Sequence, residues 1–338
     1  MTSRTVSFSR SAINVFFHIL SRCNLNCSHC YINPRQHGDQ TLPLSTIRLW
    51  LDAFADKSQK ANVIFLGGEP TLHADLPQAV RHARQSGYQS ITIDTNGYLF
   101  NDILSKITPE EVDYLSFSLD GASRSVNDAI RGKGCYDQCL SGIRRSVQGG
   151  FNTSLIYTVS ESNIHELPDM VPLVEELQID RFFIQVIGIR GKSAQKKTTT
   201  GHAGQVSREN WLEMVPAVAE AVSKKGITVT YPKVFLSRTE KFECAGLVAD
   251  NYFIFPNGRV YRCPLCEDFP LHSLAFENNR LVETPPLNEK DFFRLSIPEG
   301  CVMNKLIQPD NLAYDDTGQP EYKIACCMLK EEFYGKQR

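Results

Sequence analysis

The chain alternates strand-like and helix-like segments over its first two thirds, and this order constrains the fold more than any other feature. The strand-like runs are apolar or β-branched, and they lie at Asn14–Leu20, Asn62–Leu66, Ser90–Asp94, Tyr114–Leu119, Ser154–Val159, Arg181–Ile187 and Ile227–Tyr231. Helical patterns separate them, as at Pro43–Lys57, Leu76–Ser86 and Leu167–Leu177. Strands connected through helices form parallel sheets with right-handed crossovers. We therefore predict an α/β fold, a partial (β/α)6 TIM-like barrel, with its chemistry at the carboxyl ends of the strands.

The alternation fails after about residue 232. The remaining third is rich in proline, asparagine and aromatic residues, and it holds six of the eleven cysteines. Only short strand-like pieces remain there, at Tyr252–Phe255 and Val260–Arg262. We predict two domains, a barrel over 1–232 and a small cysteine-rich domain over 233–338.

Three cysteines stand close together after the first predicted strand. Cys23, Cys27 and Cys30 have the spacing C-x3-C-x2-C, which suits three irons of a cubane iron–sulfur cluster and leaves the fourth iron without a protein ligand. Sites that only carry electrons normally supply four ligands, so the open iron indicates a bound substrate or cofactor. A disulfide framework is disfavoured because the chain has no secretory signal. Zinc would need a fourth ligand, and His29 lies between two cysteines and is expected to point away.

Together with the adjacent Tyr31, this loop resembles the motif of the radical S-adenosylmethionine (SAM) superfamily. The resemblance implies a [4Fe–4S] cluster whose open iron binds the amino and carboxyl groups of SAM. An electron from the cluster would cleave SAM to methionine and a 5′-deoxyadenosyl radical, which takes a hydrogen atom from the substrate. The cofactor supplies this chemistry, while the protein binds, orients and shields the reacting groups.

A Gly-Gly-Glu-Pro segment follows the second predicted strand and supports the resemblance. Consecutive glycines let the backbone pass close to a ligand, and a carboxylate beside them accepts hydrogen bonds from an ammonium group. The resemblance assigns Gly67, Gly68 and Glu69 to the methionyl amino group of SAM. From the residues alone, the same segment is equally compatible with a tight strand-to-helix turn.

Further SAM contacts are implied at the ends of later strands. The resemblance places Ser118 and Asp120 near the ribose or the methionyl carboxylate, and Gly188 where the adenine approaches. Arg131 either pairs with the SAM carboxylate or forms a surface ion pair, and both interpretations remain open. Residues 190–204 are predicted to form a basic solvated loop, and the alternative is a lid or a contact for an acidic substrate or peptide. No spacing singles out a catalytic acid or base.

The cysteines of the last third form a second pattern. Cys244 is followed by thirteen residues, Gly258, four residues and Cys263, and a Pro-Asn-Gly turn between them predicts a hairpin. The pattern resembles the SPASM and twitch auxiliary-cluster regions of the superfamily. It implies one auxiliary [4Fe–4S] cluster, with ligands Cys244, Cys263, Cys301 and Cys327 and with Cys266 and Cys326 as alternates. A zinc site remains the alternative, because four-cysteine zinc sites use similar hairpins.

Composition and charge limit the partners and the cellular compartment that we expect. The 36 basic and 38 acidic residues give a formal charge of −2, which provides no strong field for nucleic acid or an anionic membrane. No apolar run approaches the roughly 20 residues of a membrane span. Abundant cysteine without a secretory signal predicts a cytoplasmic protein.

The leading functional hypothesis is a radical SAM oxidoreductase or maturase. It would abstract a substrate hydrogen and oxidise, cross-link or rearrange a ribosomal peptide or a small metabolite, with electrons from a flavodoxin- or ferredoxin-type reductant. Only 22 residues precede Cys23, too few for a fused peptide-recognition domain, so a small molecule or a separate peptide-recognition protein is expected. The alternative is an iron–sulfur electron carrier or a zinc-stabilised binding protein without radical chemistry.

Overall fold

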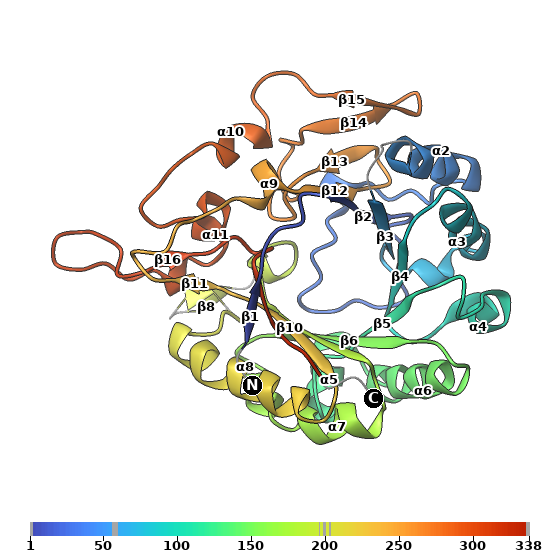
Figure 1. Cartoon of the computed structure of the whole chain (residues 1–338), viewed down its shortest axis with the longest axis horizontal. Helices are drawn as coiled ribbons and strands as arrows, with labels where there is room; N and C mark the ends of the chain where they lie inside the picture. Colours follow the sequence, from blue (N-terminus) through green and yellow to red (C-terminus); the bar gives the residue numbers. More distant parts are fainter. Residues whose placement is uncertain (1–2, 56–59, 196, 199–200, 203, 336–338) are drawn as a thin grey trace.

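The computed structural model describes residues 3–55, 60–195, 197–198, 201–202 and 204–335. A curved sheet surrounds the centre of the molecule, and helices cover its outer side (Figure 1). Its central strands are β2 (Ala12–His18), β3 (Lys60–Leu66), β4 (Ser90–Thr95), β5 (Tyr114–Ser118), β6 (Thr153–Val159), β7 (Arg181–Val186) and β10 (Thr228–Pro232). Each is parallel to its neighbour in this order, which confirms the predicted α/β partial barrel.

Helices follow the strands along the chain. The longer ones are α2 (Leu44–Ala55), α3 (Leu76–Gln85), α5 (Arg124–Arg131), α6 (Cys135–Gln148), α7 (Met170–Glu176) and α8 (Arg208–Ser223). Shorter turns are α1 (Pro34–His37), η1 (Pro70–Leu72), η2 (Phe100–Asp102), α4 (Ile103–Lys106), η3 (Ile164–Glu166) and η4 (Ser193–Gln195). The run at 227–231, listed among the strand-like segments, becomes β10 and adds a seventh parallel strand beyond the six predicted units.

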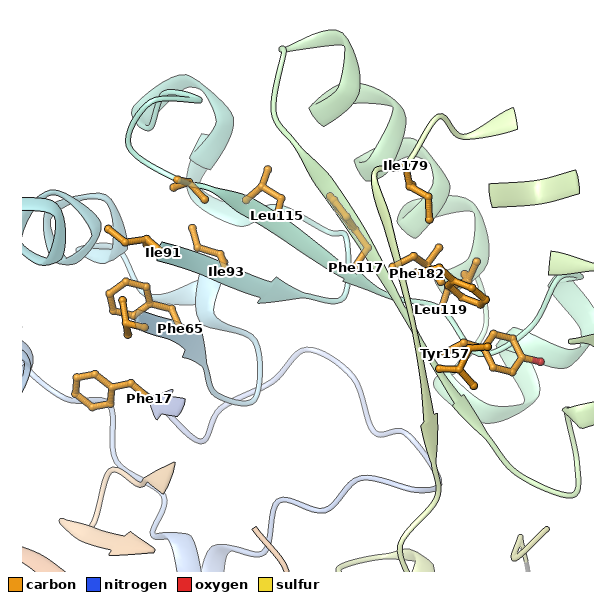
Figure 2. Packing of buried hydrophobic residues seen from close by; sticks show 14 of the residues in the cluster. Phe17, Phe65, Ile91, Ile93, Leu115, Phe117, Leu119, Tyr157, Ile179 and Phe182 are labelled. Carbon is orange, nitrogen blue, oxygen red and sulfur yellow. The ribbon is translucent and has the colours of Figure 1, made fainter. Parts of the chain in front are cut away.

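The main core lies between the sheet and the outer helices (Figure 2). Leu115 and Phe117 of β5 point into it, and neither is exposed to solvent. Burying a side chain of this kind contributes roughly 1.5–3 kcal/mol. Because side chains alternate along a strand, Ser116 and Ser118 face the opposite side, which is the barrel interior. The sequence alternation therefore divides each strand into a core face and an interior face.

The last third forms shorter elements beside the barrel. They are β11 (Phe235–Leu236), α9 (Ala245–Val248), β12 (Asp250–Ile254), β13 (Arg259–Tyr261), β14 (Leu274–Glu277), β15 (Arg280–Glu283), α10 (Glu289–Phe293), α11 (Val302–Ile307), η5 (Pro309–Asn311), β16 (Lys323–Ile324) and β17 (Lys330–Phe333). The pairs β12–β13 and β8 (Lys197–Thr198)–β9 (Gly201–His202) are antiparallel. The predicted hairpin is thus confirmed in β12 and β13, and Gly258 in its turn has φ +87°.

The amino-terminal strand and two strands of the last third extend the barrel sheet at its two edges. Strand β12 pairs in parallel with β2, while β17 pairs antiparallel with β10 and with β1 (Arg4–Val6). A side-chain ladder fixes the first of these registers: Asn62 donates to Asn14, and Asn14 donates to Asn251, both at 3.0 Å. The sheet therefore runs across the predicted domain boundary at residue 232, and that boundary remains a prediction.

Candidate site: a cysteine loop at the barrel mouth and a second cysteine group

The three-cysteine loop leaves the carboxyl end of β2 and reaches the opposite side of the barrel (Figure 1). The Ser28 amide donates to the Ile130 carbonyl in α5 at 2.9 Å, which fastens the far end of the loop. Inside the loop, the Leu25 amide donates to the Cys23 sulfur at 3.3 Å, and the Cys30 amide donates to the Cys27 carbonyl at 3.3 Å. The predicted ligands therefore lie together across the mouth of the barrel.

The loop thiols lie in partly buried surroundings. Burial raises the pKa of Cys23 to about 11, the Leu25 amide opposes the rise, and the other two loop thiols add to it. Burial also raises the pKa of Cys27, while the Arg131 guanidinium opposes that shift and the Cys30 thiol adds to it. Ionising any one of these thiols therefore opposes ionisation of its neighbours in the loop. Metal binding would offset the cost of ionising them, because the ligand form is the thiolate.

The Gly-Gly-Glu-Pro segment packs directly on the backbone of the cysteine loop. The Gly68 amide donates to the Leu20 carbonyl and the Glu69 amide to the Arg22 carbonyl, both at 3.0 Å. A Cβ atom on Gly68 would lie 2.3 Å from the Arg22 oxygen, and one on Gly67 would lie 2.6 Å from the Leu20 oxygen. The two glycines are therefore required for this close approach, whatever they also contact.

The Glu69 carboxylate is enclosed by donors from the protein. One oxygen accepts from the Thr71 amide at 3.1 Å, the Thr71 hydroxyl at 2.6 Å and the Thr95 hydroxyl at 2.9 Å. The other accepts from the Asn96 amide at 2.7 Å. Burial raises the pKa of Glu69, and these hydrogen bonds oppose the rise. Because the Asn96 side chain donates to Asn24 of the loop at 2.7 Å, Glu69 also supports the loop indirectly.

Asp120 and Arg131 form a pair at the same edge of the sheet. The Asp120 side chain has no solvent exposure, and its carboxylate lies 2.6 Å from Arg131 Nε and 3.3 Å from His29 Nε2. Its other oxygen accepts from the Thr158 amide at 2.8 Å. Arg131 is only 9% exposed, so the interpretation of it as a surface ion pair is wrong. Burial lowers the pKa of His29, although Asp120 opposes that shift.

The barrel interior carries further polar side chains. Ser118 is on the interior face of β5, as the predicted SAM contact requires. Asp94 of β4 is in register with Ser116 of β5, and burial raises the pKa of Asp94 to about 7 while the Ser116 hydroxyl opposes the rise. From the sequence, Asp94 belongs to a polar segment at the end of its strand that could hydrogen-bond a ribose or a carboxylate, and that role stays a prediction. The sequence pattern does indicate that Asp94 faces the barrel interior, because it alternates along the strand with the core residues Ile91 and Ile93.

Tyr31 connects the loop to both sides of the molecule. Its hydroxyl lies 2.8 Å from His18 Nε2, and the other His18 ring nitrogen lies 3.0 Å from the Ile254 carbonyl in β12. The Arg190 guanidinium lies over the Tyr31 ring, 4.7 Å from its centre. Burial raises the pKa of the Tyr31 hydroxyl well above its usual value. Tyr31 is thus linked through His18 to Ile254, which lies beyond the predicted domain boundary.

The segment after β7 differs from its prediction. Lys192 donates from its amide to the Cys30 carbonyl at 3.0 Å, and its ammonium group contacts Asn26. The first part of the predicted solvated loop is therefore anchored on the cysteine loop, which corrects that prediction. Lys196, Thr199, Thr200 and Ala203 lie outside the described residues. The Gly188 carbonyl accepts from the Ser193 hydroxyl at 2.6 Å, and the adenine contact predicted for Gly188 stays a prediction.

The cysteines of the last third gather at one place. One cavity is lined by Cys244, Cys263, Cys301, Cys326 and Cys327. Cys266 is buried, and its amide donates to the Cys263 carbonyl at 3.1 Å. Cys244 and Cys301 cap the amino ends of α9 and α11, and the Cys301 sulfur accepts from the Asn304 amide at 3.5 Å. The structure thus brings together all six cysteines that the sequence offered as ligands or alternates.

The adjacent cysteines at the end of the chain have different surroundings. A hydrogen bond from Cys327 lowers the pKa of Cys326 to about 7, with support from the Ala245 and Met328 amides and against the effect of burial. The same hydrogen bond and burial raise the pKa of Cys327. The two adjacent thiols therefore interact with each other, which the sequence did not reveal.

A single metal ion and an iron–sulfur cluster require different arrangements of thiols. In the described part of the chain, no three His, Cys, Asp or Glu side chains are placed to hold one metal ion. A cubane cluster makes a different demand, because each thiolate binds its own iron. Three thiols on one loop, and five around one cavity, fit that demand.

Among the described helices, none has the length and apolarity to cross a membrane.

These features define a class: an α/β partial barrel with a three-cysteine loop at its mouth and a second cysteine group beside it. Residues 18–174 match the family model of the radical SAM superfamily. These residues therefore form a radical SAM domain.

Known proteins resemble part of this chain in sequence, and solved structures resemble more of it in fold. Fe-coproporphyrin III synthase of Methanosarcina barkeri is 32% identical over 52% of this chain and 45% of its own. Pre-heme d1 synthase of Dinoroseobacter shibae is 28% identical over 54% of this chain and 45% of its own. The aligned region thus spans about half the length of these relatives. The structure of Streptococcus suis SuiB bound to precursor peptide SuiA has a TM-score of 0.68 at 13% identity, covering 88% of this chain and 74% of that one.

Proposed function

We propose that this protein cleaves SAM reductively and uses the resulting radical to abstract a hydrogen atom from its substrate. The observation that carries the proposal is the loop of Cys23, Cys27 and Cys30, which offers three thiolates and no fourth ligand at the mouth of a polar barrel interior. When bound there, a [4Fe–4S] cluster with SAM supplies the one-electron chemistry. The protein's own part is to hold, orient and shield these groups.

Gly67, Gly68 and Glu69 support the proposal by fixing the cysteine loop and by leaving their strand-end backbone beside it. We propose that this segment receives the methionyl amino group of SAM. One Glu69 oxygen already accepts three hydrogen bonds and the other accepts one, so only the second has capacity for a further donor.

The interior face of the sheet offers the remaining SAM contacts. Ser118 points to the interior, and we propose it for the ribose. The Asp120 carboxylate is occupied by Arg131, His29 and the Thr158 amide. We therefore propose that Asp120 orients Arg131 toward a SAM carboxylate instead of binding SAM itself, with Tyr31 and Gly188 completing the pocket.

The second cysteine group supports an auxiliary [4Fe–4S] cluster. Five of its cysteines line one cavity, which suits one four-ligand cluster. We propose Cys244, Cys263 and Cys301 as three ligands and either Cys327 or Cys326 as the fourth, because both line the same cavity. Such a cluster would accept an electron from the substrate radical and make the overall reaction an oxidation.

For the substrate we favour a small metabolite over a ribosomal peptide. Two relatives that share sequence with this chain are named Fe-coproporphyrin III synthase and pre-heme d1 synthase. The likeness to SuiB, which binds a precursor peptide, is one of fold alone at 13% identity. A peptide brought by a separate recognition protein is the second candidate, and a flavodoxin- or ferredoxin-type protein is the proposed electron donor in both cases.

The test is SAM cleavage by the anaerobically reconstituted protein. With SAM and dithionite, the enzyme should form 5′-deoxyadenosine, and a Cys27→Ser variant should form none while its second group keeps its iron. A wild-type protein with intact clusters that forms no 5′-deoxyadenosine would refute the proposal and favour an electron carrier. Replacing all three loop cysteines with alanine should leave about four irons per chain if the second group binds one cluster.

A further inference from the structure

One short segment, 189–192, contacts both cysteine groups. The Lys192 amide donates to the Cys30 carbonyl at 3.0 Å, and its ammonium group lies 3.4 Å from the Cys27 carbonyl. On the other side, the Gly191 amide donates to the Asp268 carboxylate at 2.7 Å. Asp268 follows Cys266 by two residues, so the segment bridges the two groups within a few residues.

The bridge fits closely against the cysteine loop. Gly191 has φ +55°, and a Cβ atom there would lie 2.5 Å from the Cys30 oxygen and 2.7 Å from Tyr31 Cα. The distance between this segment and the loop is therefore fixed by backbone contact, because no side chain fits between them.

Arg190 is the cation of this segment that reaches the second cysteine group. Its guanidinium lies 4.7 Å from the centre of the Tyr31 ring, next to Cys30, and donates to the Pro264 carbonyl at 2.5 Å, next to Cys263. It also forms an ion pair with Glu267, which is 1% exposed and follows Cys266. One cation is thus held between a residue adjacent to a loop cysteine and residues adjacent to two cysteines of the second group.

A cation at this place acts on both groups. Clusters held by several thiolates are anionic, and reduction adds a further negative charge. A fixed positive charge nearby stabilises the reduced form, more strongly where water is excluded. The Glu267 carboxylate has the opposite effect on the same groups. Neither residue is proposed as an iron ligand, so both can be replaced without removing a ligand.

We propose that Arg190 lies between the two cysteine groups and that its charge, balanced by Glu267, sets the reduction potentials of both clusters together. The inference rests on the proposed function and extends it from two separate sites to one electrostatically coupled unit.

The test is a redox titration of the anaerobically reconstituted enzyme, followed by electron paramagnetic resonance. The variant without the three loop cysteines identifies the signal of the auxiliary cluster. Arg190→Gln should shift both potentials to more negative values, and Arg190→Lys should shift them less because it retains the charge. Glu267→Gln should shift both potentials in the positive direction. Arg84→Gln is the matched control, since it breaks a partly buried ion pair with Asp113 (2.7 Å) just before β5.

The signs of the shifts in reduction potential distinguish an electrostatic effect from damage to the fold. Opposite shifts in the Arg190→Gln and Glu267→Gln variants support the proposal, whereas shifts of the same sign, no shift, or a shift of one cluster alone overturn it. If Arg190→Gln loses iron, Arg190→Lys and Glu267→Gln decide the question by the same criteria. A protein that forms 5′-deoxyadenosine but shows unshifted potentials refutes this inference and leaves the proposed function standing.

Discussion

Replacing Asp94 with asparagine should stabilise the protein at alkaline pH. Burial raises the Asp94 pKa from 3.8 to about 7, a rise of about 3 units. At about 1.4 kcal/mol per unit, the ionised carboxylate costs up to about 4 kcal/mol of unfolding free energy. Because the side chain is partly exposed in the barrel, we expect the measured effect to be smaller, about 1–3 kcal/mol.

The sign of the pH dependence follows from the direction of the shift. Between pH 3.8 and about 7, the folded protein keeps a proton on Asp94 that the unfolded chain releases. The unfolding free energy contributed by this group therefore falls as pH rises through that window, and it stays constant above it. Asp94→Asn removes this dependence, so its advantage over wild type should be small at acidic pH and largest in alkaline buffer.

The assay is urea unfolding of the iron-free chain at several pH values, followed by the fluorescence of the buried Trp50 and Trp211. Ser116→Ala should extend the pH dependence to higher pH, because the Ser116 hydroxyl holds the Asp94 pKa down. Asp113→Asn is the control, since it removes a carboxylate that accepts hydrogen bonds from Arg84 and the Ile91 amide and should only destabilise. Equal pH slopes for wild type and Asp94→Asn would refute the reasoning.

Three further predictions concern the contacts that hold the site. Gly68→Ala places a methyl group 2.3 Å from the Arg22 oxygen, and we expect the unfolding free energy to fall by about 1–3 kcal/mol. The loop should also bind severalfold less iron, measured by iron analysis of a variant lacking the second cysteine group. Asn14→Ala leaves the Asn62 and Asn251 side chains without their partner in the ladder and should cost about 1–3 kcal/mol in urea unfolding, whereas the exposed Asn152→Ala should cost less than about 1 kcal/mol. Glu69→Gln keeps one acceptor oxygen but sets an amide donor against the Thr71 or Asn96 donors, so it should lose about 1–3 kcal/mol, and an unchanged midpoint would contradict the observed enclosure of this carboxylate.

Local patterns were sufficient to predict most of the barrel. Strands β3, β5 and β6 begin within two residues of their expected positions, because apolar alternation and flanking turn residues are local signals. The cysteine loop and Gly67-Gly68-Glu69 were found for the same reason, since each motif lies on one short piece of chain. The interior position of Ser118 likewise follows from alternation along a single strand.

Contacts between distant segments were not predictable. The sequence left Arg131 as either a SAM contact or a surface ion pair, and the choice depended on where Asp120 and His29 would lie. The bridge of Arg190, Gly191 and Lys192 was taken for a solvated loop, because its partners are separated from it by more than seventy residues on one side. Such pairs leave no periodic signal in the sequence.

The sequence by itself determined the fold class, the three loop thiolates and the number of cysteines available for a second cluster, because these depend on local spacing and composition. Only the tertiary structure decided that β12 pairs in parallel with β2, that all six late cysteines gather at one place, and that one arginine lies between the two groups. The physical reason is that backbone pairing and charge burial are settled by packing between remote segments. The chemistry of each cysteine group is thus local, and the coupling between them is a property of the folded chain.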